Sequence, residues 1–286
     1  MKILLTGATG QVGYELERSL QALGEVVALD RARMDLSDLD QVRDMVRQVR
    51  PGLIVNPAAY TAVDKAESEP ELAHRINALA PGVMAAEAAL LGAAMVHYST
   101  DYVFDGSKPG AYAESDAPGP INVYGRSKLA GEQAIAAAGI PHLILRTSWV
   151  YGMRGKNFLL TMLRLAAERD SLRVVADQHG APTWSRTIAD STAAMLAQAH
   201  GGGAQWWESN SGIYHLCGQG ETTWHGFTEA IVEAAGLACK VLPITSADYP
   251  VPAPRPVNSV MTCEKLTARF CHLPHWQVAL RLCLAS

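Results

Sequence analysis

Short apolar runs alternate with longer amphipathic stretches along the first half of the chain. The runs suit buried strands, and the stretches between them repeat apolar residues at helical spacing. This pattern predicts strands at 2–5, 26–29, 53–55, 94–98 and 142–145. It predicts helices at 11–23, 39–49, 72–91 (with a break near Pro81) and 124–138. Strands that alternate with helices form βαβ units, so we expect an α/β fold: a Rossmann-type, doubly wound parallel sheet.

The pattern changes after Trp149. We predict helices at 158–168 and 187–198, a strand at 173–176 and a polar loop that begins at the glycines 201–203. Residues 243–256 contain five prolines, which favours an ordered, extended connection over a helix. These features predict a smaller C-terminal substrate-binding lobe. We expect a dinucleotide-binding domain at 1–150 plus 186–217, and a substrate-binding domain at 151–185 plus 218–286.

Length and composition fit this division. The 286 residues correspond to about two domains of ~150 residues, and 49% hydrophobic with 18% charged residues is ordinary for a globular protein. The net charge of −4 argues against a basic surface for nucleic acid or membrane lipid. The five cysteines are odd in number and lack metal-ligand spacing, which favours free thiols in a reducing compartment. We therefore expect a cytoplasmic protein without a signal peptide or membrane span.

A glycine-rich turn, residues 6–13 (TGATGQVG), joins the first predicted strand to the first predicted helix. Gly7 permits a tight turn, Gly10 lets the backbone approach a pyrophosphate, and Gly13 allows close packing of the helix. The N–H groups and the positive dipole end of the helix then face the anion. The turn therefore predicts a dinucleotide site.

Two residues at the end of the next strand bear on the choice of dinucleotide. Asp30 is placed to bind a ribose hydroxyl, as in NAD sites, and Arg31 is placed to accept the extra phosphate of NADP. The two side chains favour opposite cofactors, so the sequence leaves NADPH and NADH both open.

A second motif predicts the catalytic groups. Tyr124 and Lys128 form a YxxxK pair at the start of a helix, and positions i and i+4 share one face. A nearby cation lowers the pKa of a phenol, so we expect Tyr124 to pass a proton to a carbonyl oxygen. Thr100 and Asp101 follow a strand, and ligands of α/β sheets gather at the carboxyl ends of strands. Residues 56–60 end the preceding strand and are expected to line the cofactor.

The GxxGxxG spacing with YxxxK resembles the extended, sugar-nucleotide-modifying branch of the short-chain dehydrogenase/reductase superfamily. Longer strings resemble the dTDP-4-dehydrorhamnose reductase family within it, and this resemblance runs from residue 1 to about residue 285. These strings are residues 61–67 (TAVDKAE), 97–106 (HYSTDYVFDG), 122–125 (NVYG), 146–151 (RTSWVY), 177–183 (DQHGAPT) and 255–259 (RPVNS).

The resemblance implies reduction of the 4-keto group of dTDP-4-dehydro-L-rhamnose to dTDP-L-rhamnose, a precursor of bacterial surface polysaccharide. It implies Tyr124 as proton donor, Lys128 as its partner and Thr100 as the hydroxyl that tunes it. The implied substrate contacts are Thr100, Asp101, Trp149, Asn157 and Arg255. The expected cofactor contacts are Gly7, Gly10, Gln11, Val12, Gly13, Asp30, Arg31, Asp35, Leu36, Ala58, Ala59, Tyr60, Thr61, Tyr98, Tyr124 and Lys128.

Two other functions stay open beside this one. A regulatory subunit of the same fold would bind NADP without catalysis, although the presence of both Tyr124 and Lys128 disfavours it. A related sugar-nucleotide epimerase or dehydratase is disfavoured by Tyr102, because dehydratases of this branch carry a glutamate there as the base.

The resemblance also raises the question of a metal. Some members of the family form dimers bridged by magnesium on glutamates, and Glu15 could match the first of these. The last twenty residues contain no acid, so a set of three oxygen ligands is hard to assemble. We expect no metal site, and a monomer or a homodimer.

Overall fold

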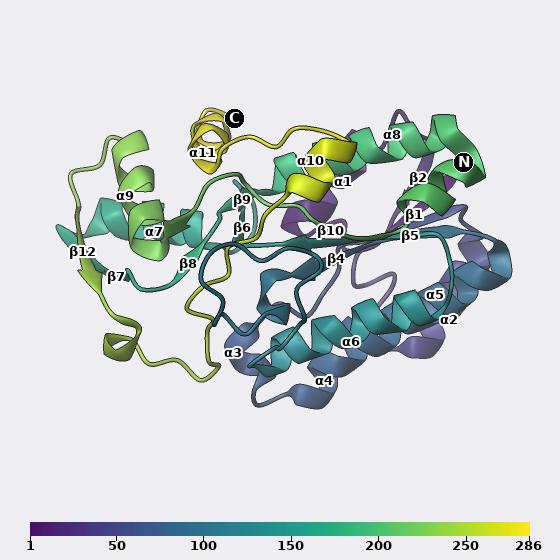
Figure 1. The fold of residues 1–286 in the computed structure, drawn as a ribbon, viewed down its shortest axis with the longest axis horizontal. Helices are drawn as coiled ribbons and strands as arrows, with labels where there is room; N and C mark the ends of the chain where they lie inside the picture. Colours follow the sequence, from purple (N-terminus) through teal and green to yellow (C-terminus); the bar gives the residue numbers. More distant parts are fainter.

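A six-stranded parallel sheet forms the centre of the molecule, and the computed structural model describes residues 1–286 throughout (Figure 1). The strand order is β10-β5-β4-β3-β1-β2. The chain moves outward from β1 in both directions, so the sheet reverses its winding between β1 and β3, where α/β proteins bind ligands. The strands are β1 (Lys2–Leu5), β2 (Glu25–Ala28), β3 (Leu53–Asn56), β4 (Ala94–Thr100), β5 (His142–Thr147) and β10 (Gly212–His215).

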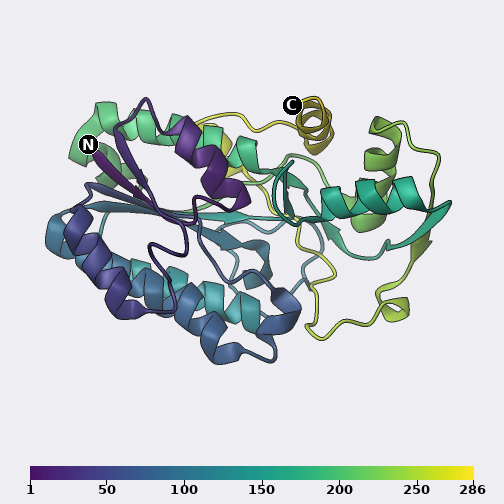
Figure 2. The ribbon, with the colours of Figure 1, turned by 180° about the vertical axis from the view of Figure 1, so that it is seen from behind.

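Helices cover both faces of this sheet, as the predicted doubly wound fold requires (Figure 2). One face carries α1 (Gln11–Ser19) and α8 (Ser185–Asn210), which pack on each other. The other carries α2, α4, α5 and α6, with a π-helix, η1, between α4 and α5. Their bounds, with the short elements near the cavity, are α2 (Leu39–Val49), α3 (Val63–Ala66), α4 (Pro70–His74), η1 (Arg75–Leu79), α5 (Ala80–Leu91), η2 (Asp101–Val103) and α6 (Val123–Ala137).

Most of the remaining elements build a smaller second lobe at one end of the sheet (Figure 1). Two helices, α7 and α9, pack together beside three two-stranded sheets: β7 with β12, β8 with β11, and β6 with β9. The elements of this part are β6 (Val150–Tyr151), α7 (Phe158–Glu168), β7 (Ser171–Val175), β8 (His179–Gly180), β9 (Thr183–Trp184), β11 (Thr222–Thr223), α9 (Trp224–Ala234), β12 (Lys240–Ile244), η3 (Ser246–Asp248) and α11 (Trp276–Leu284). The helix α10 (Glu264–Arg269) packs on β10 of the large sheet instead.

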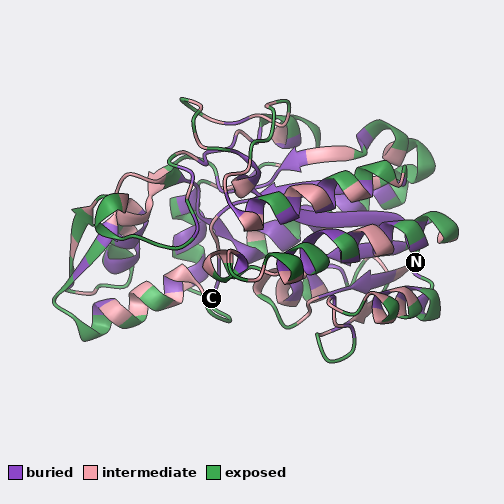
Figure 3. Ribbon diagram, turned by 90° about the horizontal axis from the view of Figure 1, so that it is seen from below, coloured by how far each residue is buried: buried purple, intermediate pink, exposed green.

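The central strands are almost entirely buried, whereas the helices expose their outer faces (Figure 3). Two apolar clusters flank the sheet, one under α1 and α8 and one under α2 and α5. Leu266 and Leu273 belong to the first cluster, although the expected division placed them in the second lobe. The exact domain boundaries stay a prediction. None of the helices is both long and apolar enough to cross a membrane.

One predicted loop is wrong. Gly203 (φ 58°, ψ −148°) breaks α8, but a second helical segment and not a polar loop follows it, up to Asn210. Beyond the break, Trp206 and Trp207 are partly buried against the core of the large sheet. The packing of two aromatic side chains outweighs the tendency of three glycines to form a loop.

The break predicted near Pro81 is a π-helix at Arg75–Leu79, directly before α5. Proline has no N–H to donate to the carbonyl four residues earlier, so the carbonyl of Asn77 loses its helical partner. Gly131 on α6 lies so close that an added Cβ would sit 2.2 Å from this same oxygen. The π-turn thereby presents the Asn77 side chain to the loop after β3.

Candidate active site

A cavity of about 590 Å³ opens at the carboxyl edge of the sheet, a size usual for small-molecule sites. Of the predicted cofactor contacts, all except Asp30 line it. The lining also includes side chains from the second lobe. Thr9 of the predicted glycine turn and Pro57 of the predicted segment 56–60 also line it, whereas Asn56 does not. The cavity residues that the motifs did not identify include Met34, Ala62, Ile76, Ser99, Thr147, Val150, Gly155 and Lys156.

The glycine turn has the geometry of a phosphate site. Gly7 has φ +58°, a conformation that L side chains rarely adopt. A Cβ on Gly13 would lie 2.1 Å from the carbonyl oxygen of Gly7. Gly10 precedes α1 without any side-chain cap, so the N–H groups of the first helical turn remain available to an anion. A dinucleotide pyrophosphate fits this cradle.

The two residues that favour opposite cofactors lie differently. The Asp30 carboxylate accepts a hydrogen bond from the Arg33 N–H at 3.0 Å and does not line the cavity. Arg31 does line it and pairs with Asp35 at 3.3 Å, with 78% of its side chain exposed. The Ser37 N–H lowers the pKa of Asp35 most. Of the two residues, only Arg31 therefore lines the cavity.

Asn77 is a site residue that sequence reasoning missed. Its carboxamide accepts from the Tyr60 N–H at 2.8 Å, and its Nδ2 donates to the Tyr60 carbonyl at 3.0 Å and to the Ser127 hydroxyl at 2.9 Å. One buried side chain thus fixes the cofactor loop after β3 to the catalytic helix α6. Only the π-turn brings it there, and no local motif indicates that contact.

The start of α6 is held tightly. Asn122 caps it by accepting from the Gly125 N–H at 2.7 Å, and its Nδ2 donates to the Pro254 carbonyl at 2.9 Å. A Cβ on Gly125 would lie 2.1 Å from the Tyr102 carbonyl oxygen. The helix therefore approaches η2 closely enough for Tyr102 to pack edge-on against Tyr124, with ring centroids 5.9 Å apart.

Tyr124 is a neutral phenol in this structure. Burial raises its pKa to about 12, and Thr100 opposes that rise through a hydrogen bond. The expected lowering of the Tyr124 pKa by Lys128 is wrong, since desolvation dominates here. A protonated phenol is the state from which Tyr124 can donate.

Thr100 and Asp101 lie together at the end of β4. The Thr100 hydroxyl donates to Asp101 Oδ1 at 2.9 Å and accepts from the Tyr102 N–H at 3.2 Å. Burial raises the pKa of Asp101 to about 6, against the lowering effect of Ser259 and Thr100 beside it. The Ser259 hydroxyl donates to the His179 carbonyl at 3.2 Å, which leaves Asp101 Oδ2 without a hydrogen-bond partner. A buried, unpartnered carboxylate oxygen is costly unless a ligand donates to it.

Lys128 is buried beneath the cavity floor. Its Nζ donates to the Tyr98 carbonyl at 2.6 Å and lies 3.2 Å from His97 Nε2. Burial lowers its pKa to about 8. One turn further along α6, Glu132 forms a bidentate pair with Arg146, at 2.9 and 2.7 Å, and both side chains are almost fully buried. This pair fixes the helix on the sheet.

Trp149 stands between the lobes in a strained conformation, with φ +45°. Its ring stacks on Trp224 of α9 at 3.6 Å between centroids and 7° between planes. Gly180 leaves the space for it, because a Cβ there would lie 2.5 Å from the ring. Trp149 does not line the cofactor cavity. Its contact with a sugar stays a prediction.

The other two predicted substrate contacts already have partners in the chain. Arg255 pairs with Asp64 at 2.9 Å. Asn157 caps α7 and donates to Gln11 Oε1 at 2.8 Å, so it joins the second lobe to the phosphate turn. The roles of both residues toward substrate stay predictions.

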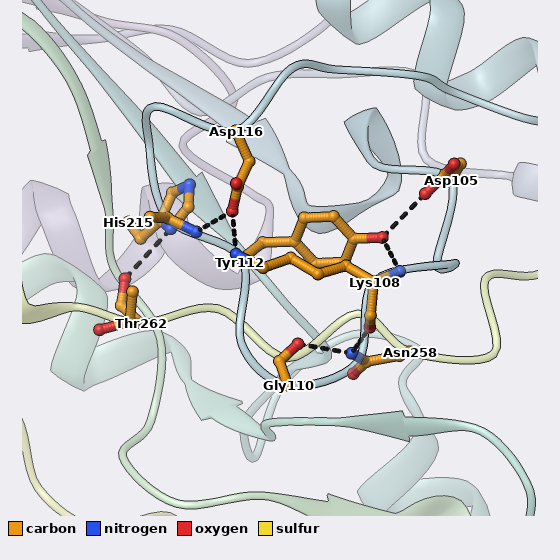
Figure 4. Close-up of polar contacts among 9 residues, drawn as sticks. Asp105, Lys108, Gly110, Tyr112, Asp116, His215, Asn258 and Thr262 are labelled. Atoms are coloured by element: carbon orange, nitrogen blue, oxygen red, sulfur yellow. Dashed lines mark hydrogen bonds and ion pairs between the residues drawn. The ribbon is translucent and has the colours of Figure 1, made fainter.

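The segment that carries Arg255 continues along the loop after η2, and Figure 4 shows how the two are joined. Asn258 donates to the carbonyls of Lys108 and Gly110 at 2.8 and 2.7 Å. Tyr112 donates its hydroxyl to Asp105 at 2.8 Å. These contacts order a wall beside Asp101 from segments about 150 residues apart in the chain.

The structure brings together no three His, Cys, Asp or Glu side chains that could hold a metal. Glu15, the possible magnesium ligand, pairs with Arg186 at 3.2 Å. A bridging ion would take ligands from two chains, so the expectation of no metal stays a prediction. All five cysteines are free thiols, and Cys271 alone is not buried.

Fold and site together define a dinucleotide-dependent oxidoreductase with a glycine turn at the first βα junction and a Tyr/Lys pair on the cavity face of α6. The chain belongs to the RmlD substrate binding domain family, whose model matches residues 1–286.

Several relatives have full-length similarity. The chain is 51% identical to the dTDP-4-dehydrorhamnose reductase of Burkholderia thailandensis, over 99% of this chain and 98% of that protein. It is 46% identical to that of Salmonella typhimurium, over 100% and 98%. A crystal structure of dTDP-4-dehydrorhamnose reductase from Bacillus anthracis in complex with NADP superposes with a TM-score of 0.91, at 36% identity, covering 99% of this chain and 98% of that one.

Proposed function

We propose that this chain is a dTDP-4-dehydrorhamnose reductase, which reduces the 4-keto group of dTDP-4-dehydro-L-rhamnose to dTDP-L-rhamnose in the cytoplasm. The observation that carries this proposal is the single cavity that joins the glycine turn to Tyr124 and Lys128. The full-length relatives with this activity support it. Tyr102 also supports reduction, because a phenol packed edge-on against Tyr124 offers no carboxylate base for dehydration.

The mechanism follows from the positions of three side chains. When bound, the reduced nicotinamide supplies a hydride to the carbonyl carbon. Tyr124, held neutral by burial, donates its phenolic proton to the carbonyl oxygen. The Thr100 hydroxyl would turn its proton from Asp101 Oδ1 to that oxygen as a second hydrogen bond. The Lys128 ammonium would stabilise the phenolate that remains.

We propose Asp101 as the acceptor for a sugar hydroxyl, because its buried Oδ2 has no partner in the protein. Trp149 offers a broad apolar face to the ring C–H groups of the sugar. Asn157 and Arg255 would complete the contacts, Arg255 toward the diphosphate of the nucleotide. For this last contact, Arg255 would have to share its charge between the phosphates and Asp64.

NADPH is the proposed cofactor, and NADH is the alternative. Two observations support the choice: Arg31 lines the cavity whereas Asp30 turns to its own backbone, and the Bacillus anthracis relative was crystallised with NADP. A guanidinium suits the 2′-phosphate that distinguishes NADPH from NADH.

The test is a coupled pair of measurements. Purified protein with dTDP-4-dehydro-L-rhamnose is expected to oxidise NADPH faster than NADH, followed by absorbance. Tyr124→Phe is expected to lose about 10²–10⁴-fold in turnover, because the proton donor is gone, with unchanged NADPH affinity by fluorescence titration. Tyr14→Phe, on the solvent side of α1, is the control. Oxidation of neither cofactor, or full turnover by Tyr124→Phe, would refute the proposal.

A further inference from the structure

A buried chain of hydrogen bonds leads from the glycine turn to Lys128. The Ala58 N–H donates to the Thr6 hydroxyl at 3.3 Å, and Thr6 Oγ1 donates to Asn56 Oδ1 at 2.6 Å. Asn56 Nδ2 lies 3.1 Å from His97 Nδ1, and His97 Nε2 lies 3.2 Å from Lys128 Nζ. Thr6, Asn56, His97 and Lys128 are each at most 1% exposed, so water does not complete this chain.

The direction of every hydrogen bond in this chain follows from the first donor, the Ala58 N–H. A backbone N–H can only donate, so Thr6 accepts from Ala58 and has its own hydroxyl proton free for Asn56 Oδ1. The Asn56 carboxamide then directs its N–H at His97 Nδ1, which must carry the lone pair. A neutral imidazole with Nδ1 as acceptor carries its proton on Nε2.

His97 therefore directs an N–H at Lys128. Burial lowers the pKa of His97 well below its ordinary value, and the Lys128 charge lowers it further, so the ring stays neutral. A charged lysine has only donors, and two donors facing each other at 3.2 Å repel. A neutral amine can accept from Nε2–H while it donates to the Tyr98 carbonyl.

We propose that His97 is a positioning residue which, through a tautomer set by Asn56, presents a donor to Lys128 and holds down its basicity. The inference rests on the proposed function, in which Lys128 stabilises the phenolate of Tyr124. The titratable groups around Lys128 are His97 on β4, and Tyr124 and Glu132 on α6. Glu132 raises the pKa of Lys128, but its carboxylate is already held by Arg146.

Asn56→Asp is the decisive variant. A carboxylate at position 56 accepts from both neighbours, so the His97 proton moves to Nδ1 and Nε2 becomes an acceptor for the Lys128 ammonium. With ¹⁵N-labelled histidine, we expect NMR spectra to show His97 protonated on Nε2 in the parent protein and on Nδ1 in Asn56→Asp. His97→Gln assigns the signals. An Nδ1-protonated His97 in the parent protein would overturn the inference.

The kinetic consequence is measured separately. We expect the alkaline limb of the pH profile of kcat/KM to lie at or below about 8 in the parent enzyme, and to move up by about one pH unit in Asn56→Asp and in His97→Gln. His97→Gln offers Lys128 a carboxamide oxygen as an acceptor. It is the variant to use if the buried carboxylate of Asn56→Asp prevents folding. His142→Gln, outside the cavity, is the control. An alkaline limb that stays in place or moves down in both variants contradicts the role of His97.

The two readouts separate this inference from the proposed function. The tautomer of His97 is observed without substrate, so it is tested even if dTDP-4-dehydro-L-rhamnose is not reduced. Conversely, reduction of the sugar with an Nδ1-protonated His97 would sustain the function and remove the inference.

Discussion

The cofactor side and the expected substrate side of the site differ in the groups that form them. The cofactor side consists of backbone: a turn with φ +58° at Gly7, free N–H groups of α1 and the loop after β3. The expected substrate side consists of side chains that are strained or unpartnered and do not line the cavity, among them Trp149 at φ +45° and Asp101 with a free Oδ2. We expect the backbone to bind what all dinucleotides share and these side chains to select the sugar.

The largest effect is expected on the cofactor side, from Gly13→Ala. The new Cβ would lie 2.1 Å from a backbone oxygen, so the turn must move and overpacking destabilises the fold by about 1–3 kcal/mol. We expect NADPH affinity to fall at least 100-fold in a fluorescence titration. Gly201→Ala is the control, because nothing lies within 4 Å of its Cβ. If Gly13→Ala kept its NADPH affinity, the glycine turn could shift to accommodate a Cβ without loss of the binding site.

On the substrate side, Asp101→Asn is expected to stabilise the protein while lowering activity. The folded pKa of about 6 lies above the ordinary value of 3.8 for an aspartate, so stability falls as pH rises from about 4 to about 6. Removing the charge should raise the free energy of unfolding by roughly 2–3 kcal/mol above pH 6 and by almost nothing at pH 4. Urea unfolding at both pH values measures this. A gain that does not depend on pH would contradict a buried carboxylate as its source.

Arg31→Ala tests whether a side chain on the cofactor side distinguishes NADPH from NADH. We expect about a tenfold loss of NADPH affinity with little change for NADH, because only the 2′-phosphate meets this exposed guanidinium. Arg33→Ala is the matched control on the same turn. Equal losses for both cofactors would assign Arg31 to the shared part of the dinucleotide instead.

The smallest effect is expected from Trp149→Phe. A smaller ring keeps part of the stack on Trp224 and covers less of the sugar, so KM for the sugar nucleotide should rise a few-fold with NADPH affinity unchanged. Trp206→Phe, at the far end of α8, serves as the control. A change in NADPH affinity with an unchanged KM for the sugar nucleotide would indicate that Trp149 contacts the cofactor and not the sugar.

The same contrast explains which features were predictable. The glycine turn and the pair Tyr124 and Lys128 were predicted because their residues are contiguous or lie one helical turn apart, and Gly7, Gly10, Gly13, Tyr124 and Lys128 all line the cavity. Asn77, Gly180 and the continuation of α8 past Gly203 were missed. Each depends on a partner distant in the sequence: Tyr60 and Ser127, Trp149, and the core beneath Trp206. Spacing along a chain does not contain that information.

The packing of α1 on α8, and of β5 on β10, has a consequence for synthesis of the chain. When the ribosome has completed residue 150, the sheet still lacks its outer strand, and Leu16 and Leu20 still lack Ile188 and Ala189 beside them. We therefore expect the sheet to be completed only after residue 215 has emerged. Only the first part of the second lobe, from β6 to β9, is translated within that interval, and α9, β12 and α11 follow it.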